Sequence, residues 1–471
     1  MSVSPVDEVL QEIGFGRFQV RMLLLCAVGY FGVCSELLVA VFLEEPLMHE
    51  FGLTTGEYAY LPFTVSLCSF TASFLAGKVA DWRGRSPVFV SALALVAGGG
   101  FLCAVCRTFW SVIMCRAVVG IGLGALAVVD YVTFQEFSPP SSRRRYLYCV
   151  FAAGCLGVLY LAGLAAFTSV GSRANWPWLV IAAALPTVPI ALLRCQVAME
   201  SPHFLASRGD IAAAYKTLQA VAERNGAASK VLPEAEFARL VRAYNTSEDC
   251  KPRGSLAAVL SYSPRRLTVP LTSIWLLQSL AYWGLTLFLP RYFSRLGVAA
   301  NRTIFLMVAC ELPGCMLSGW LIDHPQVGQA RMMRLNYIMA AAATLTLAFR
   351  IPTWTIAILT CIIYLFLIPN WGILFIYTPE SYPTEMRATA VGFYQTLQGI
   401  PAIFSPFLSA RLVSLGDAYM FAWGVCLLTA LAMSLLLETR QPAENSCSFF
   451  RLRAGSDDRT QGTAVPLRDV S

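Results

Sequence analysis

Charge is scarce in this chain of 471 residues, because Asp, Glu, Lys and Arg together make up only 13% of it. A soluble globular protein carries about 25%. Since 57% of the residues here are hydrophobic, the composition excludes a soluble domain and indicates a membrane protein. The net charge of +7 lies mainly in polar links between apolar runs. We interpret it as a signal of membrane orientation and expect no nucleic-acid partner.

Metal-binding and catalytic patterns are missing as well. The chain has three histidines, and its 15 cysteines are scattered mostly through apolar runs without a Cys/His cluster. We therefore expect no disulfide framework, no metal and no cofactor. We find no nucleotide-binding loop and no nucleophile triad, so we predict that the chain is not an enzyme and has no catalytic residue.

Apolar runs long enough to cross a bilayer core, which needs about 20 residues, recur along the whole chain. They predict an all-α polytopic membrane protein with twelve spans, near residues 20–42, 58–77, 87–106, 110–134, 147–169, 177–197, 267–289, 302–322, 333–349, 355–377, 388–413 and 418–437. An even number of spans places both termini on one side. The basic links 77–87 and 138–146 predict that this side is the cytoplasm.

A polar segment, residues 198–266, divides the spans six and six, and we expect two surface helices in it, near 209–224 and 233–245. The charged residues near the N-terminus argue against a cleavable signal peptide. The predicted organisation is a cytoplasmic N-terminus (1–19), an N-terminal six-helix bundle (20–197), a cytoplasmic loop with short helices (198–266), a C-terminal six-helix bundle (267–438) and a disordered cytoplasmic tail (439–471).

The two groups of six spans repeat one another. In the first group an acid follows the second span (Asp81) and another follows the fourth (Glu136). The second group has Asp323 and Glu380 at the corresponding places and at nearly the same separation. Each glutamate is followed by a proline and then by an arginine. Two homologous halves with a site between them are typical of a transporter that rocks about that site.

The link Gly77–Arg85 packs three bases around Asp81. A charge at the centre of a span costs roughly 2.5–3.5 kcal/mol or more, so this link must lie at the membrane surface. It either sets orientation alone or acts as a conformational latch. As a latch, Asp81 would pair with a base or with the positive end of a helix in the other half, Arg85 with Glu136, and the arginines at 143–145 with Glu200. Such contacts would exist only when the cytoplasmic gate is shut, and they would stabilise the outward-open state.

Several stretches carry a resemblance to a known family. Gly77–Arg85 resembles the G-x-x-x-D-x-x-G-R signature between the second and third helices, and Glu200–Leu205 resembles the segment that closes the sixth helix. The most specific stretch, Tyr377–Thr389, is similar to Y-T-P-E-x-Y-P-T-x-x-R-A. Over almost its whole length the chain resembles the major facilitator superfamily, in the branch of synaptic-vesicle-two-related proteins, organic cation and anion carriers and sugar porters.

The resemblance implies the major facilitator fold, with twelve transmembrane helices in two pseudo-symmetric six-helix bundles. Trp82 and Ser86 stand where the family usually has basic residues, and the second copy has lost its arginines. We therefore expect the first copy to dominate gating. The predicted gating residues are Asp81, Arg85, Glu136, Arg143, Glu200, Asp323, Glu380 and Arg387.

The predicted spans contain four ionisable residues of interest, Glu36, Arg116, Asp130 and Glu311. An intramembrane charge indicates a functional site by default. We predict that Glu36, Asp130 and Arg116 take part in proton coupling. For Glu36 the alternatives are recognition of a substrate amine or a protonated carboxyl bonded to a neighbouring helix. Pro313 after Glu311 predicts a local break that opens backbone groups to a cavity.

Aromatic and amide side chains complete the candidate substrate pocket. Trp275 and Tyr282 lie seven residues apart and should share a helix face. Aromatic faces attract cations, by roughly 0.5–2 kcal/mol each. Ordinary packing against lipid or core is the alternative interpretation. The predicted substrate-binding residues are Glu36, Tyr30, Trp275, Gln278, Tyr282, Glu311, Asn370, Trp371, Gln395 and Gln398.

These observations predict a secondary active transporter, a symporter that moves a small organic solute by alternating access with proton coupling. Gln278 and Gly399 match the positions that set substrate sign in organic-ion carriers, and both are uncharged. The buried acids favour an organic cation, a zwitterion or a vitamin-like nutrient; a neutral sugar-like solute or an organic anion stays open. The alternative class is a non-transporting receptor or vesicle regulatory protein. We expect a monomer in the lipid bilayer of the plasma membrane or of an intracellular vesicle, with both termini cytoplasmic.

Overall fold

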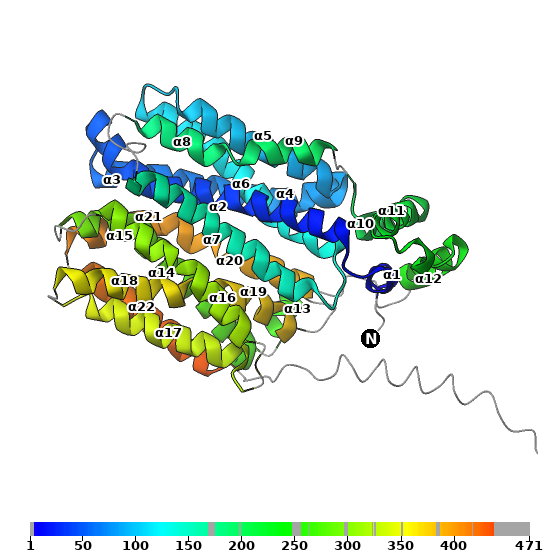
Figure 1. Cartoon of the computed structure of the whole chain (residues 1–471). Coiled ribbons are helices and arrows are strands. Elements are labelled where there is room, and N and C mark those ends of the chain that lie inside the picture. Colours follow the sequence, from blue (N-terminus) through cyan, green and yellow to red (C-terminus); the bar gives the residue numbers. More distant parts are fainter. Residues whose placement is uncertain are drawn as a thin grey trace, which may run out of the picture.

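The computed structural model describes residues 4–167, 175–196, 199–246, 256–262, 264–295, 300–322, 324, 326–349, 352–382, 387–416 and 418–437. In these ranges the regular structure consists of helices alone. Long helices lie side by side in a bundle, and a group of short helices sits at one end of it (Figure 1). We call this the cap end and the opposite end the far end.

The predicted twelve spans are present. The first half holds α2 (Arg17–Phe51), α4 (Tyr60–Arg83), α5 (Arg85–Cys103), α6 (Phe109–Phe137), α7 (Arg143–Phe167) and the pair α8 (Trp176–Ala184) and α9 (Thr187–Gln196). The second half holds α14 (Val269–Arg295), the pair α15 (Ala300–Ala309) and α16 (Glu311–Leu321), α17 (Gly328–Thr346), the pair α18 (Thr353–Leu367) and α19 (Pro369–Ser381), the pair α20 (Arg387–Leu397) and α21 (Gly399–Ser414), and α22 (Ala418–Leu435).

Ten stretches are apolar and long enough to cross a membrane by length and composition. The two other spans, α17 and the pair α20 and α21, are more polar, with arginines in the first and glutamines in the second. Within the first half α6 packs on α4 and α5, and α2 packs on α7. Within the second half α17 packs on α22, and α14 on α21. The halves meet where α4 contacts α21 and where α7 contacts α15 and α16.

Four spans are interrupted, and each interruption lies at or just before a proline. The break between α15 and α16 falls at Cys310, three residues before Pro313, which confirms the predicted break. The break between α8 and α9 contains Pro186, and the other two breaks precede Pro369 and Pro401. Proline lacks a backbone N–H and its ring clashes with the carbonyl four residues earlier, so the helix must deviate there.

The first span extends well beyond the predicted end at residue 42, because α2 continues to Phe51. The sequence suggested an end there since Glu44 and Pro46 follow. The carboxylate of Glu44 is nevertheless buried, and an Nη1 atom of Arg291 lies 3.4 Å from its Oε1 atom. This partner from α14 allows the charged residue to remain inside the bundle.

The short helices at the cap end form one packed unit, which we call the cap. It consists of α1 (Pro5–Ile13), α10 (Pro202–Ser207), α11 (Ile211–Arg224), η1 (Ala228–Lys230) and α12 (Glu234–Thr246). The helices α11 and α12 confirm the two predicted surface helices; α1 was not predicted. The apolar side of α1 is buried against α11 and α12, and the same core includes Phe134, Phe137 and Val150 of the first half.

Shorter elements complete the chain: α3 (Thr55–Tyr58) at the far end, and α13 (Leu256–Ser261) and the π-helix η3 (Pro264–Thr268) before α14. The predicted tail, 439–471, lies outside the described residues, so its state stays a prediction.

Candidate functional site

A cavity of about 720 Å³ lies between the two halves and is lined by both. Its wall reaches the cap end, where Gly77, Leu256 and Thr389 line it. At the far end the halves are joined instead. The Arg291–Glu44 contact bridges α14 and α2, and the Phe407 ring of α21 packs on the Tyr60 and Phe63 rings of α4 at centroid distances of 5.4 and 5.2 Å. The cavity is therefore associated with the cap end.

Most of the predicted substrate-binding and proton-coupling residues line this cavity. Its wall is largely apolar and includes several aromatic rings, and neither half supplies these rings alone. The predicted residues on the wall are Tyr30, Arg116, Asp130, Tyr282, Glu311, Trp371, Gln395 and Gln398. The structure thus brings together side chains from α2, α6, α14, α16, α19, α20 and the break between α20 and α21.

Four predicted substrate-binding residues lie behind the wall rather than on it: Glu36, described below, and Trp275, Gln278 and Asn370. The Trp275 indole N–H donates to Thr378 Oγ1 at 3.0 Å, and the Gln278 amide donates to the Leu367 carbonyl at 3.0 Å. The Asn370 side-chain oxygen accepts from Asn336 at 2.9 Å. Each is buried. They act, in this arrangement, by holding the neighbouring helices rather than by facing the cavity.

Trp275 nonetheless supports the wall directly. Its ring lies 5.8 Å from the Trp371 ring and 5.2 Å from the Phe375 ring, both of which line the cavity. Tyr282 packs edge-on against the same Trp371 ring at 6.0 Å. Trp275 and Tyr282 therefore share a helix face, as predicted, and that face is directed toward Trp371.

Glu36 and Arg116 form an ion pair buried from solvent. Both side chains are 0% exposed. An Arg116 Nη1 atom donates to Glu36 Oε2, and the Nη2 atom donates to the Glu36 backbone carbonyl at 2.7 Å. Arg116 lines the cavity and Glu36 lies behind it. The second carboxylate oxygen of Glu36 has no hydrogen-bond partner among the described residues, so one site on this carboxyl is available to a proton.

Two further acids line the cavity from opposite halves. Asp130 belongs to α6 of the first half and Glu311 begins α16 of the second half. Glu311 lies at a helix N-terminus, where a negative charge is favourable. Within the part of the chain that the structure describes, its carboxylate has no hydrogen bond or ion pair, so it remains open to the cavity. With Arg116 paired to Glu36, these two carboxyl groups are the acids of the wall, one from each half.

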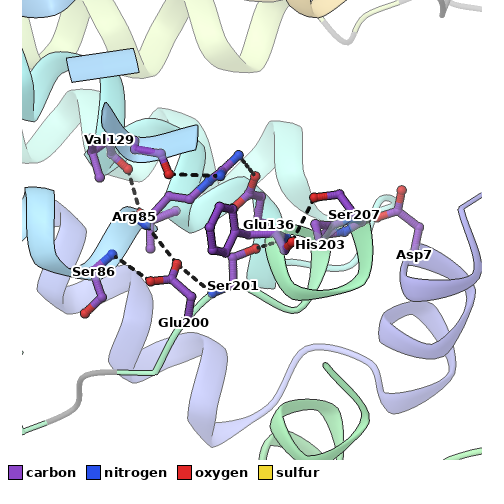
Figure 2. A network of polar contacts seen from close by, with 12 residues as sticks. Asp7, Arg85, Ser86, Val129, Glu136, Glu200, Ser201, His203 and Ser207 are labelled. Carbon is purple, nitrogen blue, oxygen red and sulfur yellow. Dashed lines mark hydrogen bonds and ion pairs between the residues drawn. The ribbon is translucent and has the colours of Figure 1, made fainter. Parts of the chain in front are cut away.

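A polar network joins the helix ends of the first half at the cap end (Figure 2). The Arg85 Nη2 atom lies 3.1 Å from Glu136 Oε1, which confirms the predicted pair. The Glu200 carboxylate accepts from the backbone N–H groups of Arg85 and Ser86 at 2.9 and 3.3 Å. Glu200 thus caps the N-terminus of α5, where unpaired N–H groups and the helix dipole favour an anion.

Glycine at position 84 makes this cap possible. Its φ angle is +101°, a region that side-chain-bearing residues rarely adopt. A Cβ atom there would lie 2.3 Å from Glu200 Oε2. The network continues to the cap, because His203 Nε2 of α10 lies 3.2 Å from Asp7 Oδ1 of α1. All of these residues belong to the first half or its cap, so rocking of one half against the other does not have to break them. The expectation that the Arg85–Glu136 pair acts as a latch for the outward-open state is therefore wrong, because the pair lies within one half and is formed while the cavity reaches the cap end.

The second half repeats this arrangement with a neutral residue. Gly328, at φ +65°, precedes Gln329 at the start of α17, just as Gly84 precedes Arg85 at the start of α5. The Gln329 amide donates to Glu380 Oε2 at 2.7 Å. The pairs Arg85–Glu136 and Gln329–Glu380 are each separated by 51 residues. Gln329 is therefore the counterpart of Arg85, which the sequence reasoning missed.

Four predicted gating residues cannot be placed. Asp323 lies outside the described residues, and so do the side chains of Asp81, Arg143 and Arg387. Their roles stay predictions.

Sequence reasoning also missed several wall residues, among them Cys34, Phe151, Cys155, Cys315, Phe375 and Phe393. One of them had a detectable signal, since Phe375 follows Trp371 by four residues and so shares its face. The cysteines had none, because a thiol in an apolar span reads as an ordinary core residue.

Comparison with known proteins shows which family the chain matches. Residues 24–406 match the family model described as Major Facilitator Superfamily. The chain is 26% identical over 462 residues to the synaptic vesicle 2-related protein of Xenopus laevis, covering 92% of this chain and 81% of that protein. It is 25% identical over 452 residues to organic cation/carnitine transporter 7 of Arabidopsis thaliana, covering 87% and 88%.

The fold is similar to the inward open conformation of the xylose transporter XylE from E. coli. The TM-score is 0.71 at 14% sequence identity, covering 91% of this chain and 98% of that one. This likeness concerns the fold alone. The family match over most of the chain and the twelve-helix architecture agree, and the chain belongs to the major facilitator superfamily, as a multi-pass membrane transport protein.

Proposed function

We propose that the protein is a proton-coupled secondary transporter that moves a small organic cation by alternating access. The observation that carries this proposal is the cavity between the halves, with aromatic rings and two acids on its wall. It reaches one end of the bundle while the halves are joined at the other. A carrier that alternates must hold such a one-sided state.

We infer that the cap end faces the cytoplasm. The basic links 77–87 and 138–146 lie at that end, and Lys and Arg are enriched on the cytoplasmic side of membrane proteins. In this orientation the conformation described is open inward, with the far-end contacts of Arg291 and Phe407 closing the outer side. The network around Arg85 and Glu200 then holds the inner ends of the first half in one rigid unit.

Charge and aromatic surface support a cationic solute. Arg116 is paired with Glu36, and two further acids, Asp130 and Glu311, line the wall beside the aromatic rings. An organic cation between aromatic faces gains about 0.5–2 kcal/mol from each well-placed ring. A relative in this family carries the name organic cation/carnitine transporter, which agrees with this assignment.

The ion pair Glu36–Arg116 and the acid Asp130 provide the proton step of the proposal. Protonation of Glu36 would release Arg116 inside a low-dielectric wall, and an unpaired buried charge costs about 3–5 kcal/mol. A penalty of this size is sufficient to couple a proton to the rearrangement of the halves.

Uptake into proteoliposomes under an imposed pH gradient tests the proposal. Quaternary and primary amines, carnitine, nicotinate and sugars are screened first by thermal shift on the purified protein. We expect an amine to bind, and Glu311→Gln to weaken its binding about 10- to 150-fold, the range of a lost charged hydrogen bond of roughly 1.5–3 kcal/mol. Glu12→Gln on exposed α1 is the matched control and should leave binding unchanged.

The two candidate proton groups are tested in the same assay. We expect Asp130→Asn or Glu36→Gln to abolish gradient-driven accumulation while solute exchange across the membrane continues. Binding of a sugar or a carboxylate in place of amines would refute the cation assignment. Amine binding without flux under any gradient would favour the receptor alternative.

A further inference from the structure

Two cysteines meet across the interface between the halves. Cys155 belongs to α7 of the first half and Cys315 to α16 of the second half. Their Sγ atoms lie 3.7 Å apart, which is van der Waals contact. Both side chains are largely buried, yet both line the central cavity. A small oxidant that enters the cavity therefore reaches them, although bulk solvent barely does.

We propose that Cys155 and Cys315 form a redox modification site, at which a peroxide joins the two halves by a disulfide. The inference that this arrests transport rests on the proposed function. A disulfide needs the sulfurs to approach to about 2.05 Å. Rotation of the two side chains and a small shift of α7 against α16 supply this movement, because the two sulfurs already touch.

The chemistry balances with a peroxide as the oxidant. One thiol attacks hydrogen peroxide, becomes a sulfenic acid and releases one water molecule. The second thiol attacks the sulfenic sulfur, which forms the S–S bond and releases a second water molecule. Each sulfur loses one electron to the peroxide. A dithiol reductant reverses the reaction by thiol–disulfide exchange.

Oxidation of this pair would link the two halves, which oxidation of the other two cysteine pairs described below would not do. The helices α7 and α16 belong to different halves and must move past one another when the halves rock. Cys106 and Cys115 also have sulfurs in contact, at 3.6 Å, but both lie in the first half. Cys310 and Cys361 interact within the second half. Only a bond between Cys155 and Cys315 among these three pairs would fasten the halves together.

This difference makes the site testable without a known substrate. A protease site is inserted between residues 247 and 255, in the link between the halves, and the full-length protein is oxidised with hydrogen peroxide in membranes. It is then denatured, alkylated, cut and run on a non-reducing gel. We expect the two fragments to stay joined and to separate after dithiothreitol. Cys155→Ala or Cys315→Ala should release them, whereas Cys106→Ala should not.

Transport is measured on the same samples. We expect uptake to fall in proportion to the joined fraction and to recover on reduction, each variant being compared with its own reduced state. Peptide mapping of the Cys106–Cys115 disulfide reports whether the oxidant reacted with the protein. If that disulfide forms and the two fragments still separate, the proposed site is wrong. If the cross-linked protein transports at the full rate, the inference that the disulfide arrests transport is wrong. Because the gel needs no substrate, it decides the cross-link even if the proposed transport fails.

Discussion

Replacement of Gly84 by alanine tests the helix cap at Glu200. Gly84 has φ +101° and ψ 163°, a combination open essentially to glycine alone, so any side chain there costs about 1–3 kcal/mol. The new Cβ would also lie 2.3 Å from Glu200 Oε2. The carboxylate would have to leave the two N–H groups that it accepts from.

Gly14 supplies a matched control. Its φ is 76° and its ψ is −178°, the same glycine-only region, but a Cβ there would meet nothing within 4 Å. Gly14→Ala is therefore destabilised by the backbone strain alone. Gly84→Ala additionally loses charged hydrogen bonds, each about 1.5–3 kcal/mol, and a helix-dipole contact of up to about 2 kcal/mol. The dipole contact and the two hydrogen bonds describe the same cap, so we expect Gly84→Ala to be less stable than Gly14→Ala by about 3–6 kcal/mol, the sum of the two hydrogen bonds.

Thermal unfolding of the purified protein in detergent, followed by tryptophan fluorescence, compares the variants. The melting temperatures should fall in the order wild type, Gly14→Ala, Gly84→Ala. A double mutant with Glu200→Gln should lose less than the sum of the two single losses, because both remove the same cap. If Gly84→Ala unfolds at the same temperature as Gly14→Ala, the Glu200 cap contributes nothing and the reasoning is wrong.

Three further predictions concern the cavity and its far-end closure. Glu36→Gln should destabilise the protein by about 3–5 kcal/mol, because it leaves Arg116 buried and unpaired; adding Arg116→Gln should recover part of the loss, and a single variant as stable as wild type would contradict this. Arg291→Gln removes a link between the halves, so hydrogen exchange at the far end should accelerate; unchanged exchange would count against an outer gate there. Trp371→Ala should weaken amine binding about 2- to 30-fold, whereas Trp82→Ala, on an exposed ring, should not.

The twelve spans were predictable because a bilayer demands long apolar runs, and a helix is the simplest structure that satisfies its own backbone in lipid. The Arg85–Glu136 pair was predictable because few charges compete for partners at a membrane surface. The second-half counterpart was not. Gln329 carries no charge, so only the spatial equivalence of Gly84 and Gly328 reveals it.

The side of each helix that faces the cavity was the least predictable property of the bundle. Trp275, Gln278 and Asn370 look like pocket residues because they are polar or aromatic within spans. In the structure their polar atoms find partners on neighbouring helices and leave the cavity to other side chains. A span buried on most sides is apolar all round, so its sequence carries little periodic signal to orient it. The helix α1 was missed because its nine residues lie in a segment with several charges.

The packing of α1 has a consequence for biosynthesis. Its apolar residues, such as Val9 and Leu10, are buried by α11 and α12, which follow it by about two hundred residues along the chain. At about 5–20 residues per second, these partners leave the ribosome roughly 10–45 seconds after α1 does. Throughout that time α1 carries an uncovered apolar stripe while the spans of the first half insert. It is therefore synthesised before the other described helices and is among the last of its half to reach its final contacts, and a truncation before α12 would leave it exposed to chaperones and proteases.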